Sequence, residues 1–363
     1  MDRRTAMKIG AAASVAAFLP RPAAAAFSPK PAGWRQFELT TRIEIPASGA
    51  PVQIWAPVPS VTEAGWMKAG ESRWTSNAAE AGLKTDPVYG AAFVHAVFPA
   101  SDAPAVLEIV STVSTQDRAA DLSSPGAAAP LTEAERALYL SPTLLIPTDG
   151  IVRETSDQIT AGASDDMEKA RRLYDWIVEN TARDPEVRGC GLGDVASMLE
   201  MGDLTGKCAD LNALYVGLAR AAGIPARDVY GLRVAPSAFG YKSLGTGSET
   251  VTKAQHCRAE VYLEGFGWVA VDPADVRKVM LEEPPKNLAI DDPKVADARA
   301  ALFGAWEGNW IAYNFAHDVA LPSAEQDPVE FLMYPQAEVD GEALDPLDPD
   351  AFAYVITARE ITA

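Results

Sequence analysis

The fold is decided by residues 206–227, which read GKCADLNALYVGLARAAGIPAR. After the cysteine, apolar residues recur at the three- and four-residue spacing of a buried helical face. Gly223 ends this periodic run, and Pro225 prevents the helix from continuing. The stretch therefore predicts a helix over residues 208–222 that begins at Cys208. Its buried face comprises Leu211, Leu214, Tyr215, Leu218 and Ala222.

Further helices are expected before this stretch and strands after it. The apolar spacing predicts helices over residues 132–140, 165–183 and 195–201. A glycine-dense loop, residues 189–194, precedes the last of these. Downstream, residues 228–234 predict a strand, and residues 257–263 and 268–271 predict a hairpin. Helices followed by antiparallel strands indicate an α+β core.

The N-terminal part of the chain has the pattern of an antiparallel β domain. Residues 37–45 alternate, with Phe37, Leu39, Thr41, Ile43 and Ile45 on one face. Short strands are also expected at 52–55, 91–98 and 105–113, which suggests a β-sandwich or a small sheet. Residues 117–132 are rich in Ala, Ser, Asp and Pro and predict a linker. The tail, residues 351–361, predicts one more strand.

Three residues have the order and setting of a nucleophilic triad. Cys208 begins a helix, His256 begins the hairpin, and Asp272 follows its second strand. A helix N-terminus and an imidazolium both stabilise a thiolate, and a carboxylate orients the imidazole. A tight hairpin would bring His256 and Asp272 to the same end of the sheet. Taken alone, each residue has a simpler explanation. Cys208 could be a small buried residue, His256 a polar residue whose hydrogen bonds are satisfied, and Asp272 the start of an Asp-Pro turn.

Residues 165–285 resemble the core of the transglutaminase-like superfamily. The similarity lies in three separated blocks: residues 206–231, the block that begins at His256, and residues 267–273, which read GWVAVDP. It implies a papain-like α+β core with Cys208 as nucleophile, His256 as base and Asp272 as orienting residue. The backbone N–H of Cys208 and the side chain of Trp176 are the candidate oxyanion donors.

One departure from the family concerns the cysteines. Members commonly carry Ala-Trp after the histidine, whereas this chain has Cys257-Arg258. With three cysteines in all, one disulfide, Cys190–Cys257, would leave Cys208 free. Three reduced cysteines are the alternative, and oxidation of Cys257 with Cys208 would switch the site off.

The first 26 residues predict a twin-arginine export signal. Arg3-Arg4 precede a short apolar run, and Ala24-Ala25-Ala26 supply small residues for cleavage. Its removal takes four basic residues and one acidic residue from totals of 31 and 50, leaving a formal charge of −22. We therefore expect a periplasmic or secreted protein that does not bind nucleic acid and does not insert stably into a membrane.

The expected domains are an N-terminal β-rich domain over residues 27–130, a catalytic core over 131–285 and a C-terminal extension over 286–363. No cofactor motif is found: residues 202–207 lack the length and the Ser or Thr of a phosphate loop. The three histidines, at 95, 256 and 317, are too scattered for a metal motif. His317-Asp318 has a smaller chance of being functional.

Two functions remain open at this point. The first is an exported cysteine hydrolase, a protease or amidase, or a transglutaminase, acting on peptide or protein amides through an acyl-enzyme. Cell-wall peptides are one candidate substrate. The second is a non-catalytic binding or assembly module that keeps the same fold.

Overall fold

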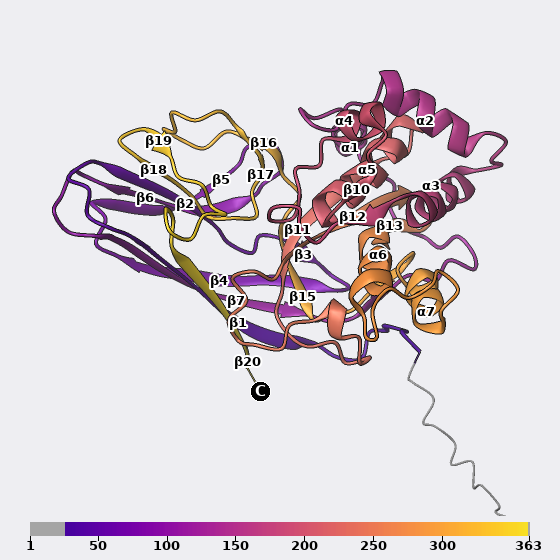
Figure 1. Ribbon diagram of the computed structural model, residues 1–363, viewed down its shortest axis with the longest axis horizontal. Helices are drawn as coiled ribbons and strands as arrows, with labels where there is room; N and C mark the ends of the chain where they lie inside the picture. The colour runs from indigo at the N-terminus through magenta and orange to yellow at the C-terminus, as the bar shows by residue number, and fades with distance from the viewer. Residues whose placement is uncertain (1–25, 362–363) are drawn as a thin grey trace, which may run out of the picture.

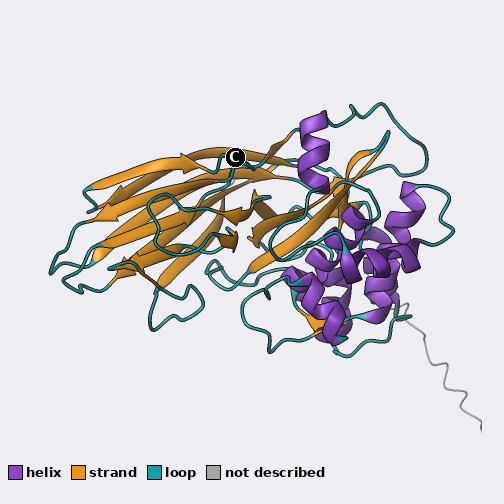
Figure 2. Ribbon diagram, turned by 90° about the horizontal axis from the view of Figure 1, so that it is seen from above, coloured by secondary structure: helices purple, strands orange, loops and turns teal. Residues whose placement is uncertain are grey.

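The structure, a computed structural model, describes residues 26–361. The predicted export signal therefore lies almost wholly outside the described residues. Long strands occupy one end of the molecule and helices gather at the other (Figures 1 and 2). Within the described part, no helix has the length and apolar character that a membrane span requires.

Two antiparallel five-stranded sheets form a sandwich at the first end. The strand order is β20-β1-β7-β4-β3 in one sheet and β19-β18-β2-β6-β5 in the other. Apolar side chains from both sheets form a common core that includes Ile43, Ile54, Val94 and Leu107. The strands are β1 (Arg35–Ile45), β2 (Val52–Pro57), β3 (Thr62–Glu63), β4 (Met67–Ser76), β5 (Glu80–Thr85), β6 (Ala92–Phe98), β7 (Ala105–Thr115), β18 (Gln336–Val339), β19 (Glu342–Ala343) and β20 (Tyr354–Ile361).

The alternation expected in the first strand is confirmed. In β1 the residues Phe37, Leu39, Thr41, Ile43 and Ile45 are buried, and those between them are partly or fully exposed. Since successive side chains of a strand point to opposite faces, one face of β1 packs on the core and the other meets solvent. β4 and β5 were not expected, because most of their residues are exposed and carry no apolar pattern.

The second end of the molecule holds a four-stranded antiparallel sheet, in the order β13-β12-β11-β15. Its strands are β11 (Ala226–Arg233), β12 (Gln255–Leu263), β13 (Gly267–Val271) and β15 (Trp310–Asn314). Helix α5 (Cys208–Ala221) lies against this sheet, and every one of its residues is buried. The predicted helix and hairpin are confirmed, and with them the α+β class.

The other helices surround α5 and the edge of this sheet (Figure 1). Helix α1 begins at a capping box formed by Thr132 and Glu135, and α3 begins at the side-chain cap of Asp165. Helix α2 was missed, because it contains several Ser, Thr and β-branched residues and buries only Val152 and Ser156. The helices are α1 (Glu133–Leu140), α2 (Gly150–Thr160), α3 (Asp166–Asn180), α4 (Val195–Met201), η1 (Lys242–Leu244), α6 (Pro273–Glu282) and α7 (Pro293–Ala301).

The C-terminal segment contributes strands to both ends of the molecule. β15 joins the core sheet through β11, whereas β18 and β20 pair with β2 and β1 in the sandwich. The tail strand expected at residues 351–361 is thus confirmed as β20. The division of the chain at residues 130 and 285 stays a prediction. The remaining short strands are β8 (Arg118–Ala119), β9 (Ala182–Arg183), β10 (Thr205–Gly206), β14 (Ala305–Trp306), β16 (His317–Val319) and β17 (Val329–Phe331).

Candidate active site

A cavity of about 670 Å³ opens beside the N-terminus of α5. Cys208 and His256 both line it, although each is less than 5% exposed. Cys208 is the first residue of α5, where the unpaired N–H groups and the helix dipole favour a negative charge. The sequence therefore places a thiol where a helix stabilises its thiolate.

The glycine-dense loop is attached to the start of α5 by Asp210. One carboxylate oxygen accepts the N–H groups of Leu192 and Gly193, each at 3.0 Å, and the other accepts that of Lys207 at 2.8 Å. Gly191 allows this approach, because a Cβ there would lie 1.8 Å from the Asp210 carboxylate. This attachment holds Cys190, the residue before Gly191, next to Cys208.

Three thiols meet at this point. The sulfur atoms of Cys190, Cys208 and Cys257 lie within 4.8 Å of one another, and all three residues are buried. No disulfide joins them, so the predicted Cys190–Cys257 bond is absent from this structure and the alternative of three free thiols is observed. Cys190 and Cys257 were expected from the sequence to lie close together, and the structure places both of them beside Cys208.

The pKa values of the three thiols are shifted in different directions. Hydrogen bonding with the thiols of Cys190 and Cys257 lowers the pKa of Cys208 well below its usual value, burial opposes this, and His256 lowers it further. The pKa of Cys190 is raised by its contact with Cys208, and that of Cys257 by burial and by both other thiols. These shifts favour Cys208 over its two neighbours as the thiol that ionises.

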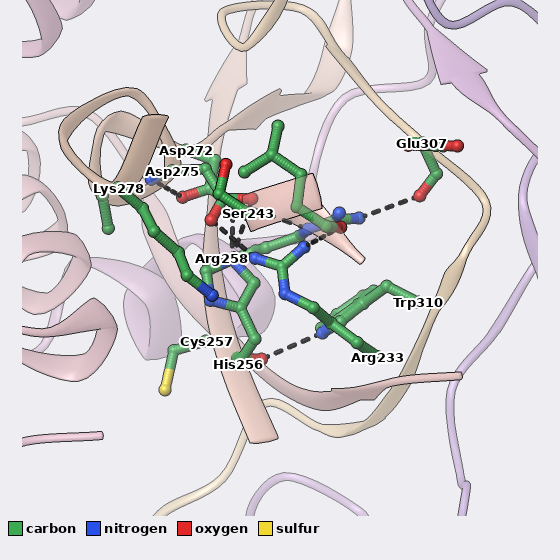
Figure 3. A network of polar contacts seen from close by, with 12 residues as sticks. Arg233, Ser243, His256, Cys257, Arg258, Asp272, Asp275, Lys278, Glu307 and Trp310 are labelled. Atoms are coloured by element: carbon green, nitrogen blue, oxygen red, sulfur yellow. Dashed lines mark hydrogen bonds and ion pairs between the residues drawn. The ribbon is translucent and has the colours of Figure 1, made fainter. Parts of the chain in front are cut away.

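The hairpin brings His256 and Asp272 together as expected. His256 Nε2 lies 2.8 Å from Asp272 Oδ2, and both side chains are buried (Figure 3). Asp272 also caps α6, since its Oδ1 accepts the N–H of Asp275 at 3.0 Å. The carboxylate therefore stays fixed at the end of β13 while it orients the imidazole.

A second carboxylate, which the sequence analysis missed, also faces the imidazole. Asp275 Oδ2 lies 3.4 Å from His256 Nε2, and its other oxygen accepts from Arg233 at 2.6 Å. Burial and Arg233 lower the pKa of His256, but Asp275 and Asp272 outweigh them and raise it to about 9. His256 is therefore an imidazolium at neutral pH, which matches the thiolate of Cys208.

Asn212 is another polar residue of the site that was missed. Its Nδ2 donates to the carbonyl of Cys257 at 2.8 Å and to Asp272 Oδ1 at 3.3 Å. It connects α5, β12 and the triad carboxylate in the buried interior. Its position one helical turn after Cys208, and that of Asp275 one turn after Asp272, are signals that could have found both residues.

Of the other residues considered for the site, Trp176 and His317 do not line the cavity and Gln255 does. Trp176 is on α3 and does not line the cavity. His317 is buried away from the cavity, 3.3 Å from Asp228 and 3.3 Å from the Tyr230 hydroxyl. Gln255 does line the cavity, and its buried Nε2 has no hydrogen-bond partner among the described residues. It is the better candidate for an oxyanion donor.

Two clusters of possible metal-ligand atoms occur among the described residues. His256, Asp272 and Asp275 form one, but Arg233, Asn212 and the imidazole itself already engage their ligand atoms. The three thiols form the other and would suit a soft metal ion. The amide chemistry derived below needs no metal at either.

Comparison with known proteins agrees with this geometry. The family model described as the transglutaminase-like superfamily matches residues 153–273, a range that includes all three triad positions. A protein of Haemophilus influenzae, described as uncharacterized, is 36% identical over 343 residues, which cover 90% of this chain and 91% of that protein.

One solved structure shows the same fold. A candidate cysteine protease from Cytophaga hutchinsonii superimposes with a TM-score of 0.50 at 16% identity, covering 90% of this chain and 99% of the other. The periplasmic domain of TgpA from Pseudomonas aeruginosa matches with a TM-score of only 0.33 at 16% identity, covering 67% of this chain and 88% of that domain.

Proposed function

Since this chain belongs to the transglutaminase-like superfamily, we propose that it is an exported cysteine hydrolase that cleaves amide bonds. Cys208 is the nucleophile, His256 the acid and base, and Asp272 the orienting carboxylate. The observation that carries the proposal is the His256–Asp272 contact of 2.8 Å on the wall of the cavity that Cys208 lines. Such an arrangement is typical of acyl transfer through a thiolate.

The first half-reaction forms an acyl-enzyme. The Cys208 thiolate attacks the amide carbonyl carbon, and a C–S bond forms as the carbonyl oxygen becomes an oxyanion. Collapse of this intermediate breaks the C–N bond. The leaving amine takes the proton held by His256, which becomes neutral.

The second half-reaction releases the acid. Neutral His256 removes a proton from a water molecule, whose oxygen attacks the thioester carbonyl. The C–S bond then breaks, and the proton remains on the imidazole beside the restored thiolate. Asp272 and Asp275 favour this resting state, because both raise the pKa of His256.

Two donors are available to the oxyanion. The first is the N–H of Cys208, because the first N–H groups of a helix have no intrahelical partner. The second is Gln255 Nε2, which is buried in the cavity wall without a partner. We expect Gln255→Ala to lower kcat by about 10²-fold, a loss typical of a missing oxyanion donor.

Export and substrate are further parts of the proposal. The Arg3-Arg4 segment and its apolar run support export to the periplasm or the medium. Peptides or proteins are the proposed substrates, with cell-wall peptides among the candidates. The strongly acidic composition argues against nucleic acid as a partner.

The test is the rate of iodoacetamide labelling of Cys208 against pH, read by mass spectrometry. In the wild type we expect a labelling pKa well below about 8.5, and in His256→Ala a higher one. His95→Gln is the matched control, because His95 lies on β6 and does not line the cavity. Slow labelling with an ordinary thiol pH dependence, unchanged in His256→Ala, would instead indicate a non-catalytic binding or assembly module.

A further inference from the structure

Apart from Cys208 itself, the charged side chains that line the active-site cavity are cationic. Six Lys and Arg side chains line it beside His256, and among the described residues no Asp or Glu does. The chain as a whole has 50 acidic and 31 basic residues, so this lining is opposite to the composition. The cations are Arg183, Arg188, Lys207, Arg233, Lys253 and Lys278.

Four of these cations have carboxylate partners behind the wall. Arg183 and Lys278 share Glu282, Arg188 pairs with Asp345, and Arg233 pairs with Asp275. The four cations line the cavity, and their carboxylate partners Glu282, Asp345 and Asp275 do not. These ion pairs hold the cationic ends in place and reduce their net charge.

Lys207 and Lys253 differ from the other four. In the part of the chain that the structure describes, neither has a carboxylate within the 4.0 Å of an ion pair. Lys207 directly precedes Cys208, and Lys253 lies three residues before His256, at an exposed position. Two uncompensated cations therefore flank the nucleophile and its base.

The C-terminal segment supplies a different wall. Tyr334, Leu347, Phe352 and Tyr354 are aromatic or apolar, and they close the cavity together with Pro346 and Pro349. The loop between β11 and β12 adds small or uncharged residues such as Gly245 and Thr250. A ligand in this space meets cations on the catalytic side and an apolar surface on the other.

We propose that the cavity selects amide substrates that carry a carboxylate near the scissile bond and an apolar group on the opposite side, which is the chemistry of an acidic peptide. This inference rests on the proposed function, since it concerns the same cavity. A carboxylate placed between Lys207 and Lys253 gains two attractive interactions close to the reacting carbonyl. The position of the charge then aligns the amide with Cys208.

The same charge bears on the second substrate. A lysine acceptor approaches the acyl-enzyme as an ammonium ion, which the uncompensated Lys207 and Lys253 repel, whereas water carries no charge. The lining therefore favours hydrolysis of the acyl-enzyme over transfer to a lysine side chain.

The test compares two alkylating reagents of nearly the same size at Cys208. Iodoacetate is an anion and iodoacetamide is neutral, so the ratio of their labelling rates reports the charge of the cavity. Because the His256 imidazolium also attracts an anion, the decisive quantity is how this ratio changes in Lys207→Gln, Lys253→Gln and the double variant. Lys84→Gln, on exposed β5, is the control.

We expect each cavity lysine substitution to lower the ratio about twofold or more, the double variant about fourfold or more, and Lys84→Gln to leave it unchanged. Raising the ionic strength from 0.02 M to 0.5 M should lower the wild-type ratio. A ratio equal in the wild type and the double variant overturns the inference. That result is distinct from failure of the proposed function, in which His256→Ala leaves the iodoacetamide labelling pKa unchanged.

A protection experiment identifies the source of the carboxylate. Acetyl-Ala-Glu-Ala-amide, acetyl-Ala-Gln-Ala-amide and acetyl-Ala-Gln-Ala with a free C-terminus each compete with iodoacetamide. Stronger protection by the first peptide indicates a side-chain carboxylate, and stronger protection by the third a C-terminal one. Equal protection by all three, or none by any, overturns the inference.

Discussion

At the scale of single residues, the proposed catalysis depends on the protonation of His256. Two buried carboxylates face its imidazole, at 2.8 and 3.4 Å from Nε2. Arg233 holds Asp275 in place: burial alone would raise the pKa of Asp275, but Arg233 and His256 together lower it well below its usual value. The charged form of Asp275 is thus available to hold the proton on His256.

We expect kcat/KM to fall as the pH rises through about 9, where His256 loses its proton. Asp275→Asn should move this alkaline limb to lower pH, because Asp275 raises the pKa of His256. The measurement is a pH–rate profile of peptide cleavage, with a thermal melt to confirm folding. An unchanged limb in a folded variant would show that Asp275 does not act on His256.

The same shift makes stability depend on pH. The folded-state pKa of about 9 lies above the ordinary value of 6.5, so the folded state binds the proton more tightly than the unfolded state. The stabilisation from His256 is therefore complete below about pH 6.5 and is lost as the pH rises through about 9. Urea unfolding of the wild type and His256→Gln between pH 6 and 10 should show the difference between them shrink.

The three neighbouring thiols predict sensitivity to oxidants. Their sulfur atoms lie within 4.8 Å, and a disulfide requires about 2.05 Å, so a modest approach suffices. Diamide should block iodoacetamide labelling of Cys208, and a reductant should restore it. In the Cys190→Ser, Cys257→Ser double variant, diamide should have no such effect, and persistent blocking there would exclude the cluster as the cause.

At the scale of elements, the start of α5 and the glycine-dense loop act as one unit. Asp210 accepts three backbone N–H groups that join them, and Ala209 donates to the carbonyl of Cys190 at 2.8 Å. Burial raises the pKa of Asp210, and these hydrogen bonds oppose the rise. The geometry around Cys208 therefore depends on a loop that lies about 15 residues before it in the sequence.

Gly191→Ala should destabilise the protein by about 2–4 kcal/mol, because the new Cβ both meets the Asp210 carboxylate and sits at a positive φ. Gly162→Ala is the matched control. That glycine also has a positive φ, of +73°, but nothing lies within 4 Å of a Cβ there, so a loss of only about 1–2 kcal/mol is expected. Urea unfolding measures both, and equal losses would contradict the role given to the contact.

At the scale of the whole molecule, the C-terminal segment connects the sandwich to the active site. β20 pairs with β1 over residues 354–361, and Val251 N donates to the carbonyl of Ile356 at 2.8 Å. Phe352, just before β20, packs in the sandwich core and also lines the catalytic cavity. The sandwich is therefore part of the wall that a substrate meets.

Phe352→Ala should lower the free energy of unfolding by about 3–5 kcal/mol, since a buried aromatic side chain is removed from the core. Val355→Ala, a change at a residue that is 48% exposed on β20, should cost about 0.5 kcal/mol or less. Chemical denaturation compares the two variants. Similar small losses would show that the sandwich core does not depend on the C-terminal segment.

Much of the core was predictable, because its signals are local. The period of apolar residues defines α5, the Gly-rich turn defines the β12–β13 hairpin, and that hairpin alone brings His256 to Asp272. The roles of Cys208, His256 and Asp272 stay a proposal, although Cys208 and His256 line one cavity and Asp272 contacts His256. Helix α2 and the exposed strands β4 and β5 were missed, since tertiary contacts rather than periodicity stabilise them.

The sequence by itself determined the α+β class, the helix that begins at Cys208, and the order of Cys208, His256 and Asp272 along the chain. The helix follows from the spacing of apolar residues, and the class follows from the order of helical and strand segments. Only the tertiary structure decided that Asp275 faces His256, that three thiols meet, that six cations line the cavity and that β20 returns to β1. Those contacts join residues up to 325 positions apart, and no local pattern specifies which distant partner closes such a loop.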